Sequence, residues 1–214
     1  MGNFKGVCKK GEVSLAKVRE EVELKINVER LNQDIKLFPQ VHPIEPDMKI
    51  LHKGVSRLVM LDRYAFKDTE KITLTEGDFV VLTVKDDPKF PARGLGFIKS
   101  IDWENKQAEV IVDKDYVNVL DNEEEMKTGI VKRSLDVIEK PLEIYYEQIA
   151  KRNATGLAAV EETEEKRQEW FEKFYKELSS LNFVPAGRVL YGAGAGTDVT
   201  YFNCYVMPYI QDSR

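Results

Sequence analysis

Apolar and polar residues alternate with a period of two in the middle of the chain. Residues 79–84, 95–101 and 107–112 are rich in β-branched and aromatic side chains, and turn-forming residues separate them. This pattern is typical of short strands, and residues 130–131 add a further candidate. Strands of this length and spacing predict a small antiparallel β-barrel of the SH3-like type across residues 70–135.

Apolar residues repeat with the helical period of 3.6 on both sides of this strand-rich module. Residues 54–64 are a candidate amphipathic helix, and Pro141 stands at the first turn of another helix that we expect to end at Gly156. Residues 160–181 carry the longest helical pattern. Its apolar side chains fall on one side of the helix: Trp170, Phe171, Phe174, Tyr175 and Leu178.

The N-terminal fifty residues have a less regular pattern. Leu24, Ile26 and Val28 alternate as in a strand, whereas residues 31–35 suit one or two helical turns. Prolines follow closely behind and prevent regular structure there. We therefore expect this part to be irregular with short helical pieces.

The C-terminal part changes character twice. A glycine-rich segment covers residues 185–196, and an apolar, aromatic and β-branched run follows at 199–207. We expect this run to be a strand that is buried on both faces. Such a strand needs neighbours on both sides, so we expect the sequence to be part of something larger.

These patterns predict an α+β fold in four parts. A change of period from two to 3.6 near Pro141 motivates the limit after the barrel module. The expected parts are an N-terminal irregular and helical segment (1–69), the small antiparallel barrel (70–135), a helical domain (136–182) and a C-terminal part (183–214).

The composition excludes several classes of protein. The chain has 214 residues, of which 43% are hydrophobic, and this is enough for a packed core in one or two domains. The net charge of −5 does not suggest a basic nucleic-acid binder. No apolar run approaches the ~20 residues of a membrane span, and the N-terminus has no apolar stretch of signal-peptide length.

Two cysteines, Cys8 and Cys204, cannot form a disulfide framework and fit a reducing, cytoplasmic compartment. With only His42 and His52 besides, we expect no zinc site and assign no metal ligands. A cysteine in a buried strand is most often a small core hydrophobe, which is the simplest interpretation of Cys204. A reactive role needs a base or a second thiol, and the residues by themselves offer no redox partner within the chain.

The glycines at 192, 194 and 196 raise the hypothesis of a dinucleotide site. The fingerprint of such sites needs a third glycine at position 197, which is Thr197, and a helix behind it. The following residues have the pattern of a strand instead. A turn-rich approach to that strand is therefore the better interpretation.

Four stretches of the sequence closely resemble the class II, adenosylcobalamin-dependent ribonucleotide reductases. They occur in the order expected for that family, and together they extend from about residue 27 to the last residue. The four stretches are 52–68, 77–81, 93–98 and the C-terminal pair 183–196 with 199–208.

This resemblance implies the N-terminal part of a catalytic chain that reduces ribonucleotides to 2′-deoxyribonucleotides by a thiyl-radical mechanism. The C-terminal part would then begin the catalytic domain, a ten-stranded α/β barrel whose remainder lies outside this sequence. Cys204 matches the first redox-active cysteine of the family, which becomes half of a disulfide as the ribose is reduced. Ala186, Gly187 and Asn203 match positions that approach the substrate.

The resemblance also implies a cofactor and partners. They are adenosylcobalamin, with most of its contacts in the remainder of the enzyme; a ribonucleoside di- or triphosphate; a thioredoxin-like reductant; and the remainder of the catalytic chain or a separate polypeptide that completes the barrel. We expect no binding to membranes or directly to nucleic acid, and no reductase activity from this chain alone. An alternative is an SH3-like interaction module with no catalysis of its own. A small nucleotide-binding oxidoreductase is a third, less favoured hypothesis.

Overall fold

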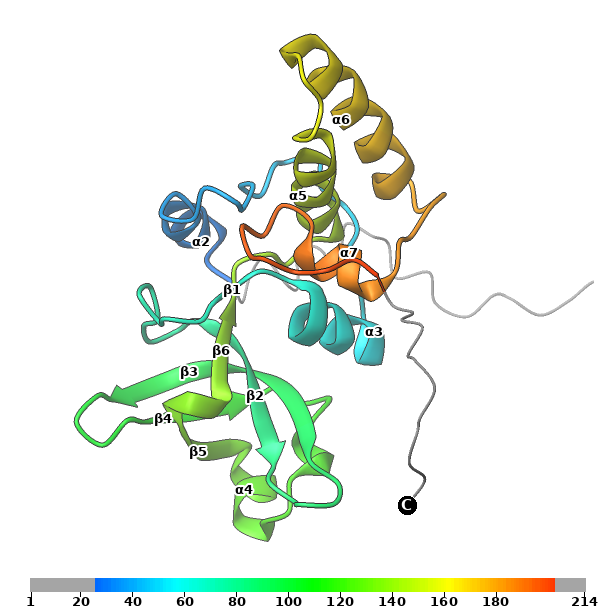
Figure 1. Ribbon diagram of the computed structural model, residues 1–214. Coiled ribbons are helices and arrows are strands. Elements are labelled where there is room, and N and C mark those ends of the chain that lie inside the picture. The colour runs from blue at the N-terminus through cyan, green and yellow to red at the C-terminus, as the bar shows by residue number, and fades with distance from the viewer. Residues whose placement is uncertain (1–25, 203–214) are drawn as a thin grey trace, which may run out of the picture.

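The computed structural model describes residues 26–202, which form a helical half and a sheet half (Figure 1). The strands are β1 (Lys67–Asp68), β2 (Phe79–Lys85), β3 (Ala92–Asp102), β4 (Gln107–Val112), β5 (Ile130–Ser134) and β6 (Ile138–Pro141). The helices are α2 (Val28–Ile35), α3 (Gly54–Val59), the π-helix η1 (Met60–Tyr64), α4 (Glu123–Thr128), α5 (Tyr146–Ala158), α6 (Glu164–Ser179) and α7 (Gly187–Gly192). Two 3-10 turns are η2 (Val117–Val119) and η3 (Leu135–Val137).

The six strands form one antiparallel sheet in the order β1-β6-β2-β3-β4-β5. The strands predicted at 79–84, 95–101 and 107–112 are confirmed as β2, β3 and β4, and residues 130–131 begin β5. Backbone pairing leaves β1 and β5 at the edges, so the sheet is open. The mixed helix and antiparallel-sheet architecture agrees with the α+β class, whereas a closed SH3-like barrel stays a prediction.

The open sheet is strongly curled. Strands β2 and β5 are separated by β3 and β4 in the sheet order, which would place them ~14 Å apart if the sheet were flat. Arg133 of β5 nevertheless donates hydrogen bonds to the carbonyl oxygens of Thr83 (3.1 Å) and Val84 (2.9 Å) in β2. The turn η3 then carries the chain from β5 to β6, beside β2.

Strand β2 contributes side chains to two hydrophobic cores. Successive side chains of a strand point to opposite faces. Val80, Leu82 and Val84 are fully buried inside the curl of the sheet, together with residues of β3, β4 and β5. Phe79 and Val81 face the other way and pack in the core of the helical half. The middle strand therefore ties the two halves together.

Helices α5 and α6 pack against each other in the helical half (Figure 1). Thr163 caps α6 by accepting a hydrogen bond from the backbone amide of Lys166 (3.3 Å). Leu178 is buried, and the aromatic side chains that share its face are partly buried against the core: Phe171, Phe174 and Tyr175. The one-sided pattern predicted for 160–181 is thus confirmed for these four residues, over the shorter span of α6. It is wrong for Trp170, which is 37% exposed and does not pack in the core.

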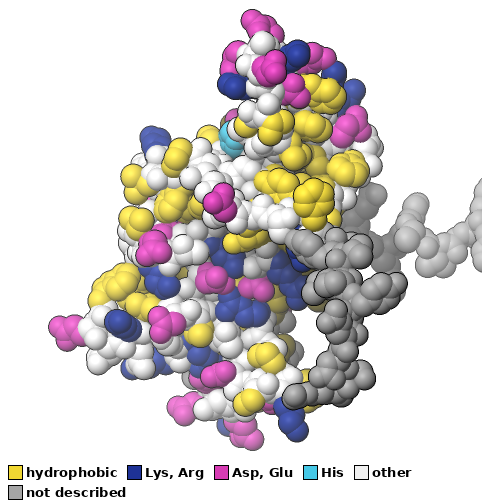
Figure 2. All heavy atoms as spheres, in the orientation of Figure 1, with side chains coloured by type: hydrophobic (Ala, Val, Ile, Leu, Met, Phe, Trp, Pro, Cys, Tyr) yellow, Lys and Arg dark blue, Asp and Glu magenta, His cyan; other side chains and the backbone are white. Residues whose placement is uncertain are grey.

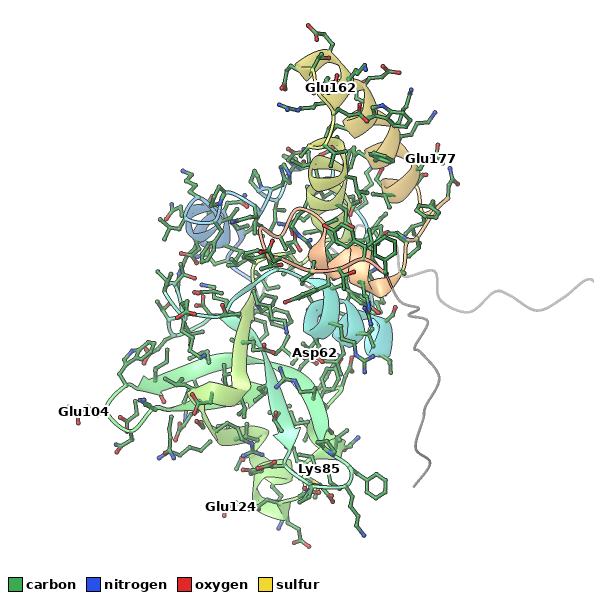
Figure 3. The ribbon with its side chains drawn as sticks, in the orientation of Figure 1. Asp62, Lys85, Glu104, Glu124, Glu162 and Glu177 are labelled. Carbon is green, nitrogen blue, oxygen red and sulfur yellow. The ribbon has the colours of Figure 1, made fainter. Side chains whose placement is uncertain are left out.

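Charged side chains also join the two halves. Lys140 of β6 is 2% exposed, and its Nζ lies 2.7 Å from Asp34 Oδ2 of α2 and 2.8 Å from Asp78 Oδ2. Arg93 of β3 forms an ion pair with Asp62 of η1 (3.0 Å). Figure 3 labels Asp62 at the junction between η1 and the sheet.

Two predicted helix boundaries are wrong. Pro141 is the last residue of β6 and pairs with Lys67, and α5 begins only at Tyr146. Proline suits this place because it is tolerated where a strand lacks a ladder partner for its nitrogen. Gly156 lies inside α5, which continues to Ala158. The division of the chain at 69, 135 and 182 stays a prediction, although the sheet itself continues to the end of β6.

Predictions near the two ends of the described residues differ from the structure as well. Val28 is the first residue of α2, which Asn27 caps by accepting a hydrogen bond from the Arg30 amide (3.0 Å), so a strand there is wrong. Residues 199–202 have no regular structure, and Phe202 is 75% exposed. The described part of the expected C-terminal strand is therefore neither a strand nor buried, and its remainder lies outside the described residues.

Candidate functional site

The first turn of α5 carries buried polar side chains that fix the segments around it. Gln148 is fully buried, and its Oε1 accepts hydrogen bonds from the amides of Ile144 (2.8 Å) and Tyr145 (3.1 Å). Its Nε2 donates to the carbonyl oxygen of His42 (2.9 Å). Glu147 accepts from the amides at positions 49 and 50. These contacts give α5 a defined place and direction.

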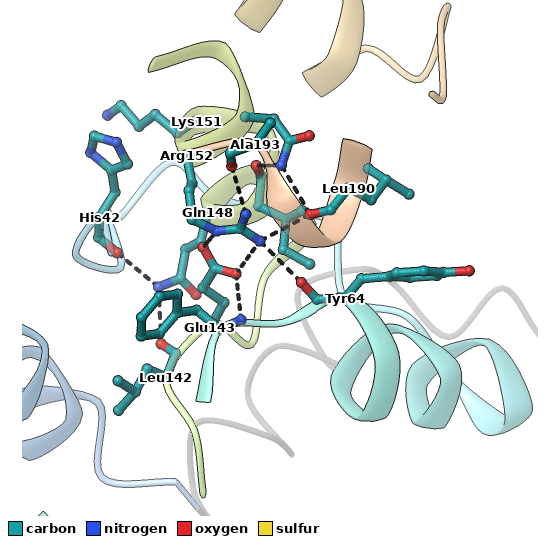
Figure 4. A network of polar contacts seen from close by, with 12 residues as sticks. His42, Tyr64, Leu142, Glu143, Gln148, Lys151, Arg152, Leu190 and Ala193 are labelled. Carbon is teal, nitrogen blue, oxygen red and sulfur yellow. Dashed lines mark hydrogen bonds and ion pairs between the residues drawn. The ribbon is translucent and has the colours of Figure 1, made fainter. Parts of the chain in front are cut away.

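An ion pair is buried where α5 faces α7 (Figure 4). Arg152 and Glu143 are 1% and 0% exposed, and Arg152 Nε lies 2.8 Å from Glu143 Oε1. Arg152 Nη2 donates to Glu143 Oε2 (3.0 Å), which also accepts from the amide of Phe66 (2.8 Å). Both carboxylate oxygens are thus satisfied, as a buried charge requires.

The remaining donors of Arg152 bind backbone carbonyl oxygens. Nη1 donates to Tyr191 (3.1 Å) and Ala193 (2.8 Å), and Nη2 donates to Leu190 (3.1 Å) and Tyr64 (3.0 Å). Carbonyls in the last turn of a helix have no partner within it. The guanidinium supplies partners and a positive charge at this end of α7, which also suits the helix dipole. We call Arg152 with these four carbonyls the carbonyl clamp.

Two glycines bring the backbones of α5 and the loop after α7 into contact. A Cβ on Gly156 would overlap the amide nitrogen of Gly194 and would lie 2.5 Å from its Cα. A Cβ on Gly194, whose φ is +73°, would overlap the carbonyl oxygen of Arg152. Both positions therefore require glycine, and the expectation that Gly156 ends a helix is replaced by this packing role.

Asn153 adds a further polar contact between α5 and α7. It is fully buried, and its Nδ2 donates to the carbonyl oxygens of Ile149 (3.0 Å) and Leu190 (3.1 Å). Its Oδ1 has no hydrogen-bond partner among residues 26–202. Leu190 O thus receives hydrogen bonds from both Asn153 and Arg152.

Ala186 and Gly187, two residues predicted to approach the substrate, lie at the start of α7. Ala186 is the exposed N-cap residue, and Gly187 is the half-buried first residue of the helix. A Cβ on Gly187 would be 2.9 Å from Tyr64 Cε1. Tyr64 therefore contacts the start of α7 with its ring, while its carbonyl oxygen belongs to the carbonyl clamp.

The other two predicted site residues, Asn203 and Cys204, lie outside the described residues, as does Cys8. The chain that leads to them runs beside α7. Arg188 Nη1 donates to the carbonyl oxygen of Phe202 (2.6 Å), and a Cβ on Gly192 would overlap the side chain of Val199. The structure therefore brings Ala186, Gly187 and residues 199–202 to one small helix, while the roles predicted for the four site residues stay predictions.

Exposed apolar side chains surround this helix, and we call them the α7 apolar face. Figure 2 shows hydrophobic side chains gathered between α6 and α7 on the face in view. The α7 apolar face consists of Phe183, Val184, Tyr191, Tyr201 and Phe202, each more than 40% exposed. Exposed apolar groups in this number mark a surface that is suited to contact with other apolar groups.

The histidines lie away from α7 and are held by polar neighbours. His42 Nε2 lies 3.1 Å from Thr155 Oγ1, and burial followed by the charge of Lys151 lowers its pKa below 6.5. His52 Nδ1 lies 3.2 Å from Ser56 Oγ, and burial lowers its pKa as well. Both imidazoles are therefore mainly neutral at pH 7.

Sequence reasoning missed the residues that build this site. Glu143, Arg152 and Asn153 resemble ordinary solvated polar residues of a helical segment, because nothing in their spacing marks them as buried. A signal was present in the small residues Ala150, Ala154 and Ala158, which are all buried and indicate close helix packing. The short helix α7 was also missed, because its glycines favour turns.

Within residues 26–202, no group of three or more His, Cys, Asp or Glu side chains is arranged to hold a metal ion. In the same range, no helix combines the length and the apolar character needed to cross a membrane.

Part of the chain matches a known protein family. Residues 132–198 match the family described as ribonucleotide reductase, all-alpha domain. The match covers about a third of the chain and spans β6, α5, α6 and α7, together with most of β5. No curated protein and no solved structure matches the chain. The family match supports this region as the N-terminal region of a ribonucleotide reductase large chain, without distinguishing the class.

Proposed function

We propose that this chain is the N-terminal part of an adenosylcobalamin-dependent ribonucleotide reductase, and that α7 with the segment after it lines the nucleotide site. The observation that carries the proposal is the family match at 132–198, because it covers the helices that position Ala186 and Gly187. The resemblance of the stretches at 52–68 and 183–208 to class II enzymes supports the finer assignment.

In the proposed reaction the 2′-hydroxyl of a ribonucleotide is replaced by hydrogen. The thiols of Cys204 and of a second cysteine of the enzyme supply two electrons and two protons, and they become a disulfide. The hydroxyl leaves as water, so that atoms and electrons balance. A thioredoxin-like dithiol then reduces the disulfide by thiol exchange.

The described residues act on this reaction through binding and placement. Ala186 is small and exposed, so a nucleotide can approach the backbone at the N-cap of α7. Gly187 lets the ring of Tyr64 pack against the first residue of the helix, because a Cβ there would lie 2.9 Å from Tyr64 Cε1. The α7 apolar face would be covered by the remainder of the catalytic barrel, supplied by the same or a separate polypeptide. Its burial would exclude water from a radical intermediate.

Adenosylcobalamin supplies the radical initiator when it is bound. Following the family resemblance, we place most of the contacts of this cofactor in the remainder of the enzyme and assign it no step here. The two cysteines of the sequence suit a reducing compartment, and we propose a cytoplasmic location on that basis.

The test is an assay of the natural full-length protein that carries this sequence. It would be incubated with adenosylcobalamin, a dithiol and either a ribonucleoside diphosphate or a triphosphate. We expect 2′-deoxyribonucleotide from one of the two substrates, and only in the presence of the cofactor. No product from either substrate would overturn the proposal, and product without the cofactor would overturn the class II assignment.

A second candidate function is a binding module without catalysis. A hollow of about 290 Å³ on the sheet favours it, because its lining is mostly apolar: Phe97, Ile111, Val112, Asp113 and Lys114. Binding of a partner through this hollow by a protein that is inactive in the reductase assay would favour this alternative.

A further inference from the structure

We infer that Arg152 and Gly156 are positioning residues, which together fix α7 and the glycine loop after it against α5 and thereby set the path of the chain toward Cys204. This inference rests on the proposed function, because Cys204 is a redox residue only in a reductase. It adds to that function two residues of α5 that touch neither substrate nor cofactor.

The first of the two contacts that fix α7 against α5 is the carbonyl clamp. Arg152 reaches three carbonyl oxygens at the end of α7, those of Leu190, Tyr191 and Ala193, and also that of Tyr64 at the end of η1. The planar guanidinium holds these acceptors in one geometry, because its donors form a rigid fork. Glu143 holds the fork in turn through two hydrogen bonds.

The second part is the backbone contact between Gly156 and Gly194. It lies one helical turn beyond Arg152 on α5, and on the other side it engages the loop just after the clamped carbonyls. The clamp therefore fixes the end of α7, and the glycine contact fixes the next residues. Together these two contacts restrict the movement of the first residues after α7.

The path after Gly194 returns along α7. Val199 packs on Gly192, and the carbonyl oxygen of Phe202 accepts a hydrogen bond from Arg188. Cys204 follows Phe202 by two residues in the sequence. A displacement of α7 or of the loop would therefore shift the chain at Val199 and Phe202, the described residues that precede Cys204 in the sequence.

Such a displacement matters because disulfide formation has narrow geometric requirements. The two Cα atoms must lie within roughly 4.4–6.8 Å of each other. A shift of about 1 Å at a reacting group can reduce a rate by about a hundredfold. The ring of Tyr64 contacts Gly187 at the start of α7, and the carbonyl oxygen of Tyr64 belongs to the carbonyl clamp. We therefore expect Gly156→Ala, which leaves these contacts in place, to act mainly on kcat, whereas a change at Arg152 should affect both kcat and KM for the nucleotide.

The first experiment measures amide hydrogen exchange in the 214-residue chain. The variants are Gly156→Ala, which forces the two backbones apart, and Arg152→Lys, which keeps the charge but loses the fork. We expect exchange at Leu190, Ala193 and Ala195, whose amides bond within this segment, to be at least tenfold faster in both. Two controls are Ile149→Val, which weakens the α5 core, and Lys151→Ala, which removes the neighbouring cation.

The direction of the stability change in Gly156→Ala tests whether the two backbones are in close contact. Alanine is a better helix former than glycine, so a variant without a clash would be more stable than the parent. A more stable variant, or faster exchange spread evenly over the chain as in Ile149→Val, would overturn the inference. If Gly156→Ala does not fold, the comparison of Arg152→Lys with Lys151→Ala tests the inference instead. Amide exchange in the α7 segment should then be faster in Arg152→Lys alone.

The second experiment measures turnover in the natural full-length protein, well below its unfolding temperature. We expect both variants to lower kcat at least tenfold, with KM changed less than twofold in Gly156→Ala and raised in Arg152→Lys, whereas both controls stay within twofold of the parent. Local loosening without a loss of kcat would overturn the positioning role. A parent protein that reduces no ribonucleotide would overturn the proposed function, while the exchange result still decides whether the clamp and the glycine contact hold α7.

Discussion

Removal of the Lys140 ammonium group should strongly destabilise the fold. Its Nζ is bound by Asp34 (2.7 Å), Asp78 (2.8 Å) and the carbonyl oxygen of Thr73 (2.9 Å), in a place where Lys140 is 2% exposed. Lys140→Met would keep the length of the side chain but leave two carboxylates without this partner. Breaking a buried ion pair on one side costs about 3–5 kcal/mol.

The structure places this variant near the lower limit of that range. Asp78 keeps Arg30 Nη2 at 3.1 Å and the amide of Thr75 at 2.8 Å, and Asp34 is 19% exposed, so that water can solvate it in part. We therefore expect a loss of about 3 kcal/mol in the free energy of unfolding. For a chain of this size, that loss lowers Tm by roughly 6–12 °C.

Urea unfolding followed by circular dichroism would measure this loss, with an unchanged m value as a check on the denatured state. Lys99→Met is the matched control, because the Lys99–Glu109 pair is exposed to solvent and should contribute little to stability. The double variant Lys140→Met with Asp34→Asn should lose less than the sum of the two single changes. A loss below about 1 kcal/mol for Lys140→Met would refute the reasoning.

Three further predictions concern a titrating histidine, the redox cysteine and a helix cap. Burial lowers the pKa of His42 in the folded state below 6.5, so its contribution to stability is complete above the unfolded pKa and is lost as pH falls through the folded one. His42→Gln should therefore reduce the loss of urea-unfolding stability between pH 7 and pH 5, and an unchanged loss would contradict this. In the natural full-length protein, Cys204→Ser should abolish multiple turnover with a dithiol while the fold is kept, and Cys8→Ser should have little effect; the reverse result would disprove the redox assignment. Thr163→Ala should cost about 1 kcal/mol in chemical unfolding by removing the cap of α6, and a variant as stable as the parent would show that the cap contributes nothing.

The strands of the sheet were predictable because their side chains carry a local signal. Residues 95–101 and 107–112 alternate or are β-branched, and each segment pairs with its neighbour across a short turn. The register and the curl were not predictable in the same way. The curl brings Arg133 to the carbonyl oxygens of Thr83 and Val84, which precede it by 50 and 49 residues in the sequence, and no local pattern encodes such a contact.

The candidate site was less predictable than the fold. Ala186 and Gly187 were singled out by family resemblance, and the structure adds their place at the start of α7. Glu143 and Arg152 could not be found, because charged residues are usually solvated and their burial depends on contacts between separate elements. Gly156 is visible in the sequence, but a glycine near a helix end resembles a stop signal, and only the position of Gly194 reveals the close contact.

Strand β2 contributes to both hydrophobic cores, and this limits how recombination can divide the region. Val81 belongs to the core of the helical half, and Val80 and Leu82 belong to that of the sheet half, within one continuous strand. A recombination event on either side of β2 would deprive one core of its central side chains. The two halves should therefore unfold in one cooperative transition and pass between genes as a single unit, even though their sequence patterns resemble those of two separate modules.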